Sequence, residues 1–316
     1  MQPELNDTIF VAGHKGLVGN AIIKNLEARG FENILTVDRN EVDLKDSNRV
    51  ADFFEVNDID YVYDAAAKVG GIHANNTYPA EFIYDNLMVQ NNIIHACHAN
   101  GIKKMIFLGS VCIYPKFAPE PVKEESLLTS HLEPTNEPYA IAKIAGIKMC
   151  QAYRKQYGSN FVSVMPCNLY GENDNFHPQN SHVLPALIRR FHEAKVNNAS
   201  SVTCWGTGSA RREFMDADDL ADALTFLMDV YDSGDIINIG CGVDYTIKEV
   251  TETIKEIVGF KGEILWDTTK PDGTPRRMLD SSKLKGLGWT PKIDLRTGLQ
   301  KAYNWYFQTL WKRQIT

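Results

Sequence analysis

The stretch Ile9-Phe10-Val11-Ala12-Gly13-His14-Lys15-Gly16-Leu17-Val18-Gly19 decides the fold. A short apolar run leads into a turn with three glycines, and helical spacing of apolar residues follows until Gly30. Such a turn between a strand and a helix is typical of dinucleotide binding, because glycine lets the backbone approach a pyrophosphate and the helix N-terminus offers free N–H groups. The spacing G-x-x-G-x-x-G is weak evidence alone, since glycines also serve turning and packing. Its position favours a bound cofactor.

Strands and helices continue to alternate beyond this unit. Apolar runs predict strands at 34–37, 61–63, 105–108 and 161–165. Helical patterns cover residues 79–100 and 138–157. This alternation predicts an α/β fold with a doubly wound parallel sheet, the Rossmann architecture. We therefore assign residues 1–170 to a dinucleotide-binding Rossmann domain.

The composition changes after Gly171. Residues 171–182 are rich in Asn, His and Pro, and later stretches contain long loops. We expect residues 171–316 to form a smaller, mainly substrate-binding subdomain, with a segment near 215–245 that returns to the Rossmann domain. A strand at 236–239 would make that return, and an amphipathic helix at 295–312 would close the chain.

Composition excludes several classes of protein. The 316 residues carry a net charge of -7, which argues against a general nucleic-acid binder because phosphates need an excess of cations. No apolar run is long enough for a membrane span. The opening Met1–Asp7 has neither a basic stretch nor an apolar core, so we expect no signal peptide. Six scattered cysteines without a C-x-x-C pair predict free thiols in the cytoplasm and no metal site.

Charged residues near the second strand bear on the choice of cofactor. An acidic residue there accepts hydrogen bonds from a ribose 2′-OH, whereas arginine attracts a 2′-phosphate. This chain has both, as Asp38 and Arg39, and also Lys15 in the turn. The two cations favour NADP (as NADPH) modestly, and use of NADH remains open. The competing interpretation is that Lys15 and Arg39 are solvated surface charges.

Tyr139 and Lys143 form a candidate proton-transfer pair. Their i, i+4 spacing, just after Pro138, places the phenol and the ammonium on one face of a helix. A nearby ammonium favours the phenolate and so lowers the pKa of a tyrosine. The strand before this helix ends in Gly109-Ser110, and Ser110 can donate to a carbonyl oxygen at the edge where such sheets bind ligands. The alternative is a surface or packing pair.

Several longer motifs are specific enough to carry a resemblance. They are Leu108–Pro115, Pro166–Gly171, Asn173–Pro178 and Ser181–Leu187. With the glycine turn, Ser110 and the Tyr139/Lys143 pair, they resemble the extended short-chain dehydrogenases/reductases and, within them, the GDP-fucose synthase family. The resemblance runs from about residue 8 to residue 305.

The resemblance implies a bifunctional epimerase/reductase. Such an enzyme converts GDP-4-keto-6-deoxy-D-mannose to GDP-L-fucose by C3/C5 epimerisation and then NADPH-dependent reduction at C4. The implied catalytic residues are Ser110, Cys112 as base, Tyr139, Lys143 and His182 as acid. The implied cofactor-binding residues are Gly13, Lys15, Gly16, Leu17, Val18, Gly19, Asp38, Arg39, Ala66, Leu108, Gly109, Tyr139, Lys143, Pro166, Asn168, Leu169 and His182. Implied contacts to the GDP-sugar are Arg190, Trp205, Arg212 and Asp280.

Plainer interpretations of these residues stay open. Cys112 can be a small buried hydrophobe and His182 a loop histidine with structural hydrogen bonds. Arg189 can exchange roles with Arg190 on their helix. Trp205 can fill core volume. The pair Arg211/Arg212 can be bonded to Glu213 or Asp216.

Two other functions fit part of the pattern. A nucleotide-sugar 4-epimerase or 4,6-dehydratase shares the fold but does not need the Cys112/His182 pair. A non-catalytic dinucleotide-binding regulator commonly loses the tyrosine or the lysine, and this chain keeps both. The resemblance implies a homodimer formed by the helices at 79–100 and 138–157, although their apolar faces can equally cover the sheet.

Overall fold

A parallel sheet of six strands forms the centre of the larger part of the molecule. The computed structural model describes residues 2–178, 180–270 and 272–311. The strand order is β2-β1-β3-β4-β5-β9, and every pairing in the sheet is parallel. The strands are β1 (Ile9–Ala12), β2 (Ile34–Leu35), β3 (Tyr61–Asp64), β4 (Lys104–Leu108), β5 (Phe161–Pro166) and β9 (Ile237–Ile239). The predicted parallel sheet is confirmed.

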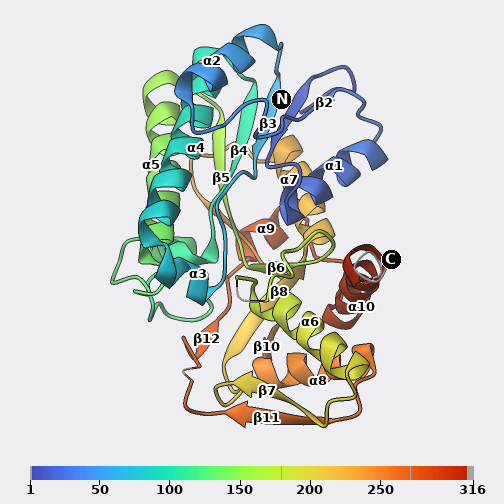
Figure 1. Ribbon diagram of the computed structural model, residues 1–316. Helices are drawn as coiled ribbons and strands as arrows, with labels where there is room; N and C mark the ends of the chain where they lie inside the picture. Colours follow the sequence, from blue (N-terminus) through green and yellow to red (C-terminus); the bar gives the residue numbers. More distant parts are fainter. Residues whose placement is uncertain (1, 179, 271, 312–316) are drawn as a thin grey trace.

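Helices cover both faces of this sheet (Figure 1). On one face lie α1 (Leu17–Ala28) and α7 (Ala217–Val230), which pack against each other. On the other lie α2 (Ser47–Val56), α4 (Pro79–Ala99) and α5 (Glu137–Tyr157). The strands β1, β3, β4, β5 and β9 have almost no exposed surface, because helices cover both of their faces, whereas the edge strand β2 is partly exposed. The fold is therefore doubly wound, as predicted.

The second strand is shorter than the sequence suggests. We predicted residues 34–37, but β2 ends at Leu35. The chain then turns, and the carbonyl oxygen of Asp38 accepts hydrogen bonds from the N–H groups of Glu41 and Val42. Those bonds replace the ladder bonds that a longer strand would make. Asp38 consequently lies in a turn beyond the sheet.

A smaller unit lies below the sheet in Figure 1. It contains two small sheets: one of β6 (Asn168–Tyr170), β8 (Arg211–Asp216), β10 (Asp244–Thr246) and β12 (Arg276–Arg277), the other of β7 (Ser201–Trp205) and β11 (Glu263–Asp267). Its helices are α6 (Val183–Val196), α8 (Ile247–Val258) and α10 (Leu295–Trp305), which continues into the π-helical segment η3 (Tyr306–Trp311). These helices enclose a separate apolar core around Phe191, Val250 and Leu299.

Short elements connect the two parts. They are α3 (Ile72–Thr77), η1 (Val111–Ile113), η2 (Glu124–Ser126) and α9 (Ser282–Gly286). The strand β6 follows β5 after a single residue, Cys167, and pairs with β8 of the smaller unit. The carboxyl end of β5 is therefore held between the two units. Within the described residues, we find no helix that combines the length and the hydropathy needed to cross a membrane.

The turn after β1 requires glycine at residue 19. A Cβ atom there would collide with the backbone carbonyl of Gly13, which cannot move aside as a flexible side chain can. We expect Gly19→Ala to lower the free energy of unfolding by roughly 1–3 kcal/mol because the turn must open. Chemical denaturation measures the change. The control is Gly286→Ala in α9, where an added Cβ meets no atom within 4 Å. Equal effects of the two substitutions would contradict the close contact.

Candidate active site

The glycine turn forms a cradle at the start of α1. Gly13 has φ of +81°, and a Cβ there would lie 2.8 Å from the carbonyl oxygen of Ala65. The helix starts at Leu17, and its N-cap, Gly16, makes no side-chain cap, so the first N–H groups of the helix are available. The turn also touches Ala66, at the end of β3. A cradle that any side chain would fill, with open N–H donors, fits a dinucleotide pyrophosphate.

Asp38 and Lys15 are paired with each other beside this cradle. The Lys15 ammonium lies 2.5 Å from the Asp38 carboxylate, and His14 Nε2 lies 3.3 Å from it. The hydrogen bond from Lys15 lowers the pKa of Asp38. Arg39 is exposed and lies 3.9 Å from Asp43. Lys15 and Arg39 each lie near a carboxylate. The charges at this edge therefore favour neither NAD nor NADP by themselves.

Ser110, Cys112 and Tyr139 come together at the carboxyl end of β4. The N–H of Cys112 donates to Ser110 Oγ at 3.3 Å. Tyr139, in the first turn of α5, interacts with both. Burial raises the pKa of the phenol, the Cys112 sulfur adds to that rise, and a hydrogen bond with Ser110 opposes it. Tyr139 and Cys112 are therefore both desolvated, and each interacts with the other and with Ser110.

The position of Lys143 corrects one expectation. We predicted that this lysine lowers the pKa of Tyr139, but the pKa of Tyr139 lies above its ordinary value. The Lys143 ammonium donates to the carbonyl oxygen of Leu108 at 2.9 Å and lies over the Phe107 ring, 4.7 Å from its centroid. The ammonium is directed toward β4, so burial, and not Lys143, determines the direction in which the pKa of Tyr139 shifts.

Two arginines on neighbouring strands act on Cys112. Burial raises the pKa of its thiol, while Ser110, Arg277 and Arg212 lower it. Arg212 of β8 and Arg277 of β12 are partners in the strand register. Arg277, which the sequence reasoning missed, is buried and donates to the carbonyl oxygen of Pro115 at 3.0 Å. Its only sequence signal was the Arg-Arg pair after the 270–275 loop.

His182 is the exposed N-cap residue of α6. The segment just before it rests on Gly71, where a Cβ would lie 2.6 Å from the carbonyl oxygen of Ser181, and Gly71 N–H donates to Asn180 at 3.2 Å. Desolvation by the surrounding protein lowers the pKa of His182. A lowered pKa makes the imidazolium a stronger acid but a less populated one at neutral pH.

The other cofactor candidates lie at the ends of β4, β5 and β6. Gly109 N–H donates to the carbonyl oxygen of Val164 at 2.8 Å, which fixes the end of β4 against β5. Asn168 Nδ2 donates to the carbonyl oxygen of Glu213 at 2.9 Å. Pro166 is the last residue of β5. Apolar contacts hold Leu108 in the core of the Rossmann sheet and pack Leu17, Val18 and Leu169 against it.

The substrate candidates occupy different environments. Trp205 is 61% exposed at the end of β7, so the interpretation as core filler is wrong. Arg190 Nη1 donates to the carbonyl oxygen of Thr203 at 2.9 Å on the same strand. Asp280, two residues before α9, accepts from Ser282 N–H at 2.9 Å. Arg190 and Trp205 thus lie on adjoining elements, while Asp280 also has a structural task.

One further plain interpretation is settled by the contacts of neighbouring arginines. Arg211 lies 3.0 Å from Asp244, not beside Glu213 or Asp216. Of the ion pairs among the described residues, none includes Arg212, whose guanidinium bonds to the Arg211 carbonyl oxygen at 2.8 Å. Arg189 Nε donates to Glu193 at 2.7 Å, so both Arg189 and Arg190 have a hydrogen-bond partner.

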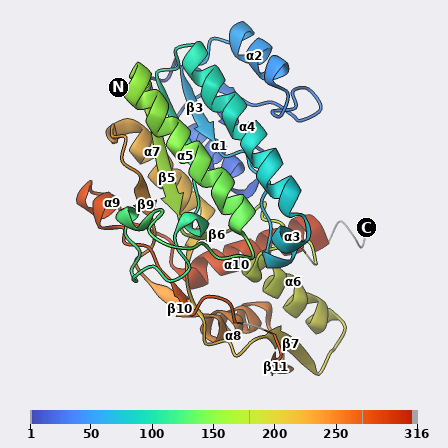
Figure 2. The same cartoon turned by 90° about the vertical axis from the view of Figure 1, so that its left-hand side faces the viewer.

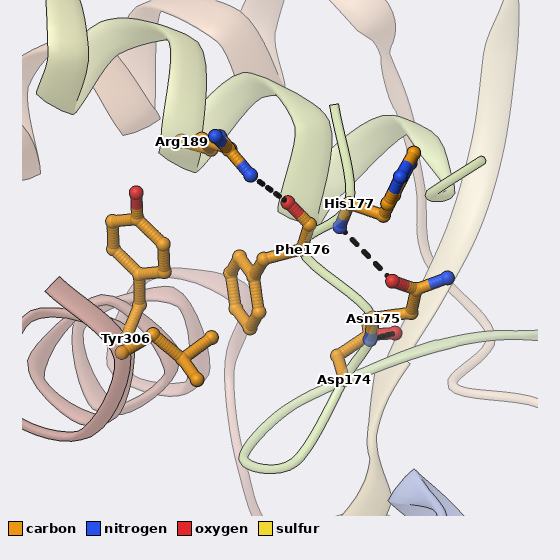
Figure 3. A pocket seen from close by; sticks show the side chains of 7 residues that line it. Asp174, Asn175, Phe176, His177, Arg189 and Tyr306 are labelled. Carbon is orange, nitrogen blue, oxygen red and sulfur yellow. Dashed lines mark hydrogen bonds between the residues drawn. The ribbon is translucent and has the colours of Figure 1, made fainter. Parts of the chain in front are cut away.

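A hollow of about 300 Å³ is lined by Arg189 and by residues of the 174–177 loop (Figure 3). It is enclosed by the 174–177 loop, α6 and η3, and Arg189 donates there to the carbonyl oxygen of Phe176 at 3.1 Å. None of the predicted catalytic or substrate residues lines it. We therefore place the candidate active site at the carboxyl edge of the sheet.

Asp64, the last residue of β3, is a buried carboxylate that the sequence reasoning missed. It has no exposed surface, and its register partner on β4 is Phe107, the ring beneath the Lys143 ammonium. One oxygen accepts from Ala66 N–H at 3.3 Å, and the other has no partner. Burial raises the pKa of Asp64 to about 6, and the nearby Lys143 opposes that rise.

Comparisons with known proteins agree with this geometry. The "NAD dependent epimerase/dehydratase family" matches residues 9–240. The chain is 61% identical to a putative GDP-L-fucose synthase 2 of Arabidopsis thaliana, over 97% of this chain and 94% of that protein. It is 53% identical to a GDP-L-fucose synthase of Escherichia coli strain K12, over 95% and 96%. A solved GDP-L-fucose synthetase of Naegleria fowleri bound to NADP superimposes with a TM-score of 0.91 at 27% identity, covering 98% and 96%.

The raised pKa of Asp64 predicts a pH-dependent effect of substitution. A carboxyl whose pKa is higher in the folded state contributes its full stability below about pH 4 and loses it as the pH rises through 6. We expect Asp64→Asn to raise the free energy of unfolding by about 2–3 kcal/mol at pH 8, and by almost nothing at pH 4. Denaturation at several pH values measures the difference. Asp58→Asn, at an exposed position, is the control. A constant difference would refute the assignment.

Proposed function

Because this chain belongs to the NAD dependent epimerase/dehydratase family and, within it, to the GDP-L-fucose synthases, we propose that it converts GDP-4-keto-6-deoxy-D-mannose to GDP-L-fucose. The enzyme inverts C3 and C5 of the sugar and then reduces the C4 ketone, with NADP as its cofactor. The observation that carries the residue assignment is the grouping of Ser110, Cys112 and Tyr139 at the end of β4, beside Arg212.

Epimerisation needs one base and one acid. The C4 ketone acidifies the protons on C3 and C5, so a thiolate at Cys112 removes each of them in turn. Arg212 and Arg277 favour that thiolate, because both lower the pKa of Cys112. His182 returns a proton from the other side. Ser110 and Tyr139 donate hydrogen bonds to the C4 oxygen and stabilise the enolate.

Reduction then uses the same oxygen site. When bound, NADPH supplies the hydride to C4. Tyr139 gives its proton to the resulting alkoxide, and its raised pKa keeps the phenol protonated and ready to donate at neutral pH. Pro166, Asn168 and Leu169 lie at the ends of β5 and β6, and Lys143 of α5 reaches the carbonyl oxygen of Leu108 at the end of β4. These four residues would hold the nicotinamide half. The cradle of the glycine turn would hold the pyrophosphate.

Arginine suits the diphosphate of the GDP-sugar. Its planar guanidinium donates two parallel hydrogen bonds, and Arg190 and Arg212 are the candidates. Trp205 offers an exposed aromatic face for the base or the sugar. Asp280 offers an acceptor for hydroxyl or amino groups. Under this proposal residues 1–170 bind the cofactor and residues 171–316 mainly the substrate, with the 215–245 segment lying in the Rossmann domain.

The proposal also covers the oligomeric state of the protein and its location in the cell. In Figure 2, α4 and α5 run side by side across the face of the molecule turned to the viewer. Tyr84 and Tyr157 on these helices are 60% and 54% exposed. Exposed aromatic side chains favour contact with a second copy, so we propose a homodimer through this face. Six free cysteines suit the cytoplasm.

An assay with GDP-4-keto-6-deoxy-D-mannose and NADPH tests the function. The wild type should consume NADPH and form GDP-L-fucose. Tyr139→Phe should lower kcat by at least about 100-fold, because it removes the hydroxyl that gives its proton to the C4 oxygen. Cys112→Ser should block epimerisation. Tyr157→Phe, at the far end of α5, is the matched control.

Three outcomes separate the competing functions. Absence of both NADPH consumption and a fucose product would refute the proposal. In a separate assay with a GDP-hexose that carries a C4 hydroxyl, inversion at C4 without net cofactor consumption would indicate a 4-epimerase. Tight NADP binding without turnover of either sugar would indicate a regulator. Unchanged fucose formation by Cys112→Ser would remove that residue from the mechanism.

The preference between cofactors depends on Asp38. Its carboxylate neutralises Lys15 and repels a 2′-phosphate, so Asp38→Ala should raise the NADPH/NADH ratio of kcat/KM by roughly tenfold. Steady-state kinetics with both cofactors measures the ratio. Asp58→Ala, at an exposed position before β3, serves as the control. If the ratio stays constant in Asp38→Ala, Asp38 does not face the ribose.

A further inference from the structure

Two cysteines and a glutamate meet at the carboxyl edge of the sheet. Cys167 follows β5 directly, and Cys241 lies two residues after β9. Their sulfur atoms and one carboxylate oxygen of Glu213 all lie within 4.8 Å of one another. The backbone fixes this arrangement, because Cys167 N–H donates to the carbonyl oxygen of Ile239 at 2.9 Å. None of the three side chains has a task in the proposed mechanism.

The glutamate of this cluster already accepts hydrogen bonds from backbone N–H groups. Glu213 has no exposed surface, and its two oxygens accept from Gly242 N–H at 2.7 Å and Leu279 N–H at 3.1 Å. A metal ion would compete with both bonds. The two thiols make weaker hydrogen bonds. Cys241 Sγ donates to the carbonyl oxygen of Phe214 at 3.2 Å, and Cys167 Sγ lies 3.8 Å from the carbonyl oxygen of Asn168. The cluster therefore favours chemistry between the two sulfurs.

The positions of the two sulfur atoms permit a disulfide. Pro166 and Ile239 are register partners at the ends of β5 and β9, and Cys167 and Cys241 lie just beyond them. The two sulfur atoms lie within 4.8 Å of each other. An S–S bond is about 2.0 Å long, so rotation of the side chains with a small backbone shift closes it.

We propose that Cys167 and Cys241 are a thiol–disulfide modification site, and that closing the disulfide weakens binding of the cofactor. Cys241 is partly exposed, whereas Cys167 is only 4% exposed. Cys241 therefore reacts first and Cys167 resolves the intermediate. The effect on the cofactor rests on the proposed function, because Cys167 is flanked by Pro166 and Asn168.

The oxidant would be a small disulfide such as oxidised glutathione. The Cys241 thiolate attacks one of its sulfurs, breaks the S–S bond and expels one glutathione thiolate, which takes up the proton of Cys241. The Cys167 thiolate then attacks the Cys241 sulfur and expels the second glutathione. Glu213 stands next to both sulfurs and can pass on the proton of Cys167. The two cysteines lose two electrons and two protons, and one glutathione disulfide becomes two thiols.

Closing the bond changes the end of β5. It removes the hydrogen bond from Cys241 to the Phe214 carbonyl oxygen and draws the residue between Pro166 and Asn168 toward β9. The nicotinamide half of the cofactor is proposed to lie at these residues. Small displacements of positioning groups are costly, so the oxidised protein should bind NADPH less tightly.

The test uses full-length protein with Cys112→Ser as the parent, which removes the reactive thiol of the proposed active site. The parent is incubated with oxidised glutathione and a metal chelator. Peptide mass mapping should find Cys167 joined to Cys241, and dithiothreitol should reverse the link. The variant Cys112→Ser/Cys241→Ser should lack it, while Cys112→Ser/Cys204→Ser, which removes a buried thiol of β7, should behave as the parent.

Cofactor titration completes the test. Oxidation should raise the Kd for NADPH of the parent by at least about fivefold, a change of roughly 1 kcal/mol, and leave that of the Cys241→Ser variant unchanged. Absence of the Cys167–Cys241 link overturns the modification site. A link without a change in Kd overturns its effect on the cofactor. Neither result depends on turnover of the GDP-sugar, so failure here is distinguishable from failure of the proposed function.

Discussion

The parallel direction of all six strands is the constraint on which the rest of the structure depends. Parallel strands deliver their carboxyl ends to one edge of the sheet. The turn at Gly13, the buried Asp64, Ser110, and Pro166 all follow strands that end there. Residues separated by more than 150 positions in the sequence therefore meet without any motif that links them. The edge is also where the smaller unit joins, through the pairing of β6 with β8.

Desolvation sets the chemistry at this edge. Burial raises the pKa values of Cys112, Tyr139 and Asp64 and lowers that of Lys143, so each of these groups is pushed toward its neutral form. For Tyr139 this suits proton donation. For Cys112 it opposes the thiolate, and positive charge must compensate. Under the proposed mechanism, the smaller unit supplies that charge through Arg212 and Arg277.

Several side chains at this edge of the sheet make hydrogen bonds that stabilise the backbone. Glu213 binds backbone N–H groups on both sides of β8, and Asn168 binds the carbonyl oxygen of Glu213. The thiol pair Cys167/Cys241 lies within this framework. A change in the bonding of the two sulfurs is therefore transmitted to the strand end by short backbone connections. Proximity of this kind makes the pair a suitable place for control of cofactor binding.

The sequence by itself determined the local units of this protein. The apolar runs, the glycine turn and the caps predicted the parallel sheet and the bounds of the long helices to within a residue or two, because each depends on neighbouring residues. The Tyr139/Lys143 spacing and the resemblance indicated the catalytic groups. The end of β2 was predicted too late, because a turn beyond Leu35 competes with the strand.

Only the tertiary structure decided in which direction the pKa values of these groups shift. The spacing of Tyr139 and Lys143 suggested a lowered phenol pKa, but the ammonium is bound by the Leu108 carbonyl oxygen and burial raises that pKa. The approach of Arg277 to Cys112 and the meeting of Cys167 with Cys241 also depend on strands that are distant in sequence. Burial and long-range contact are properties of the assembled sheet, and no local pattern of residues records them.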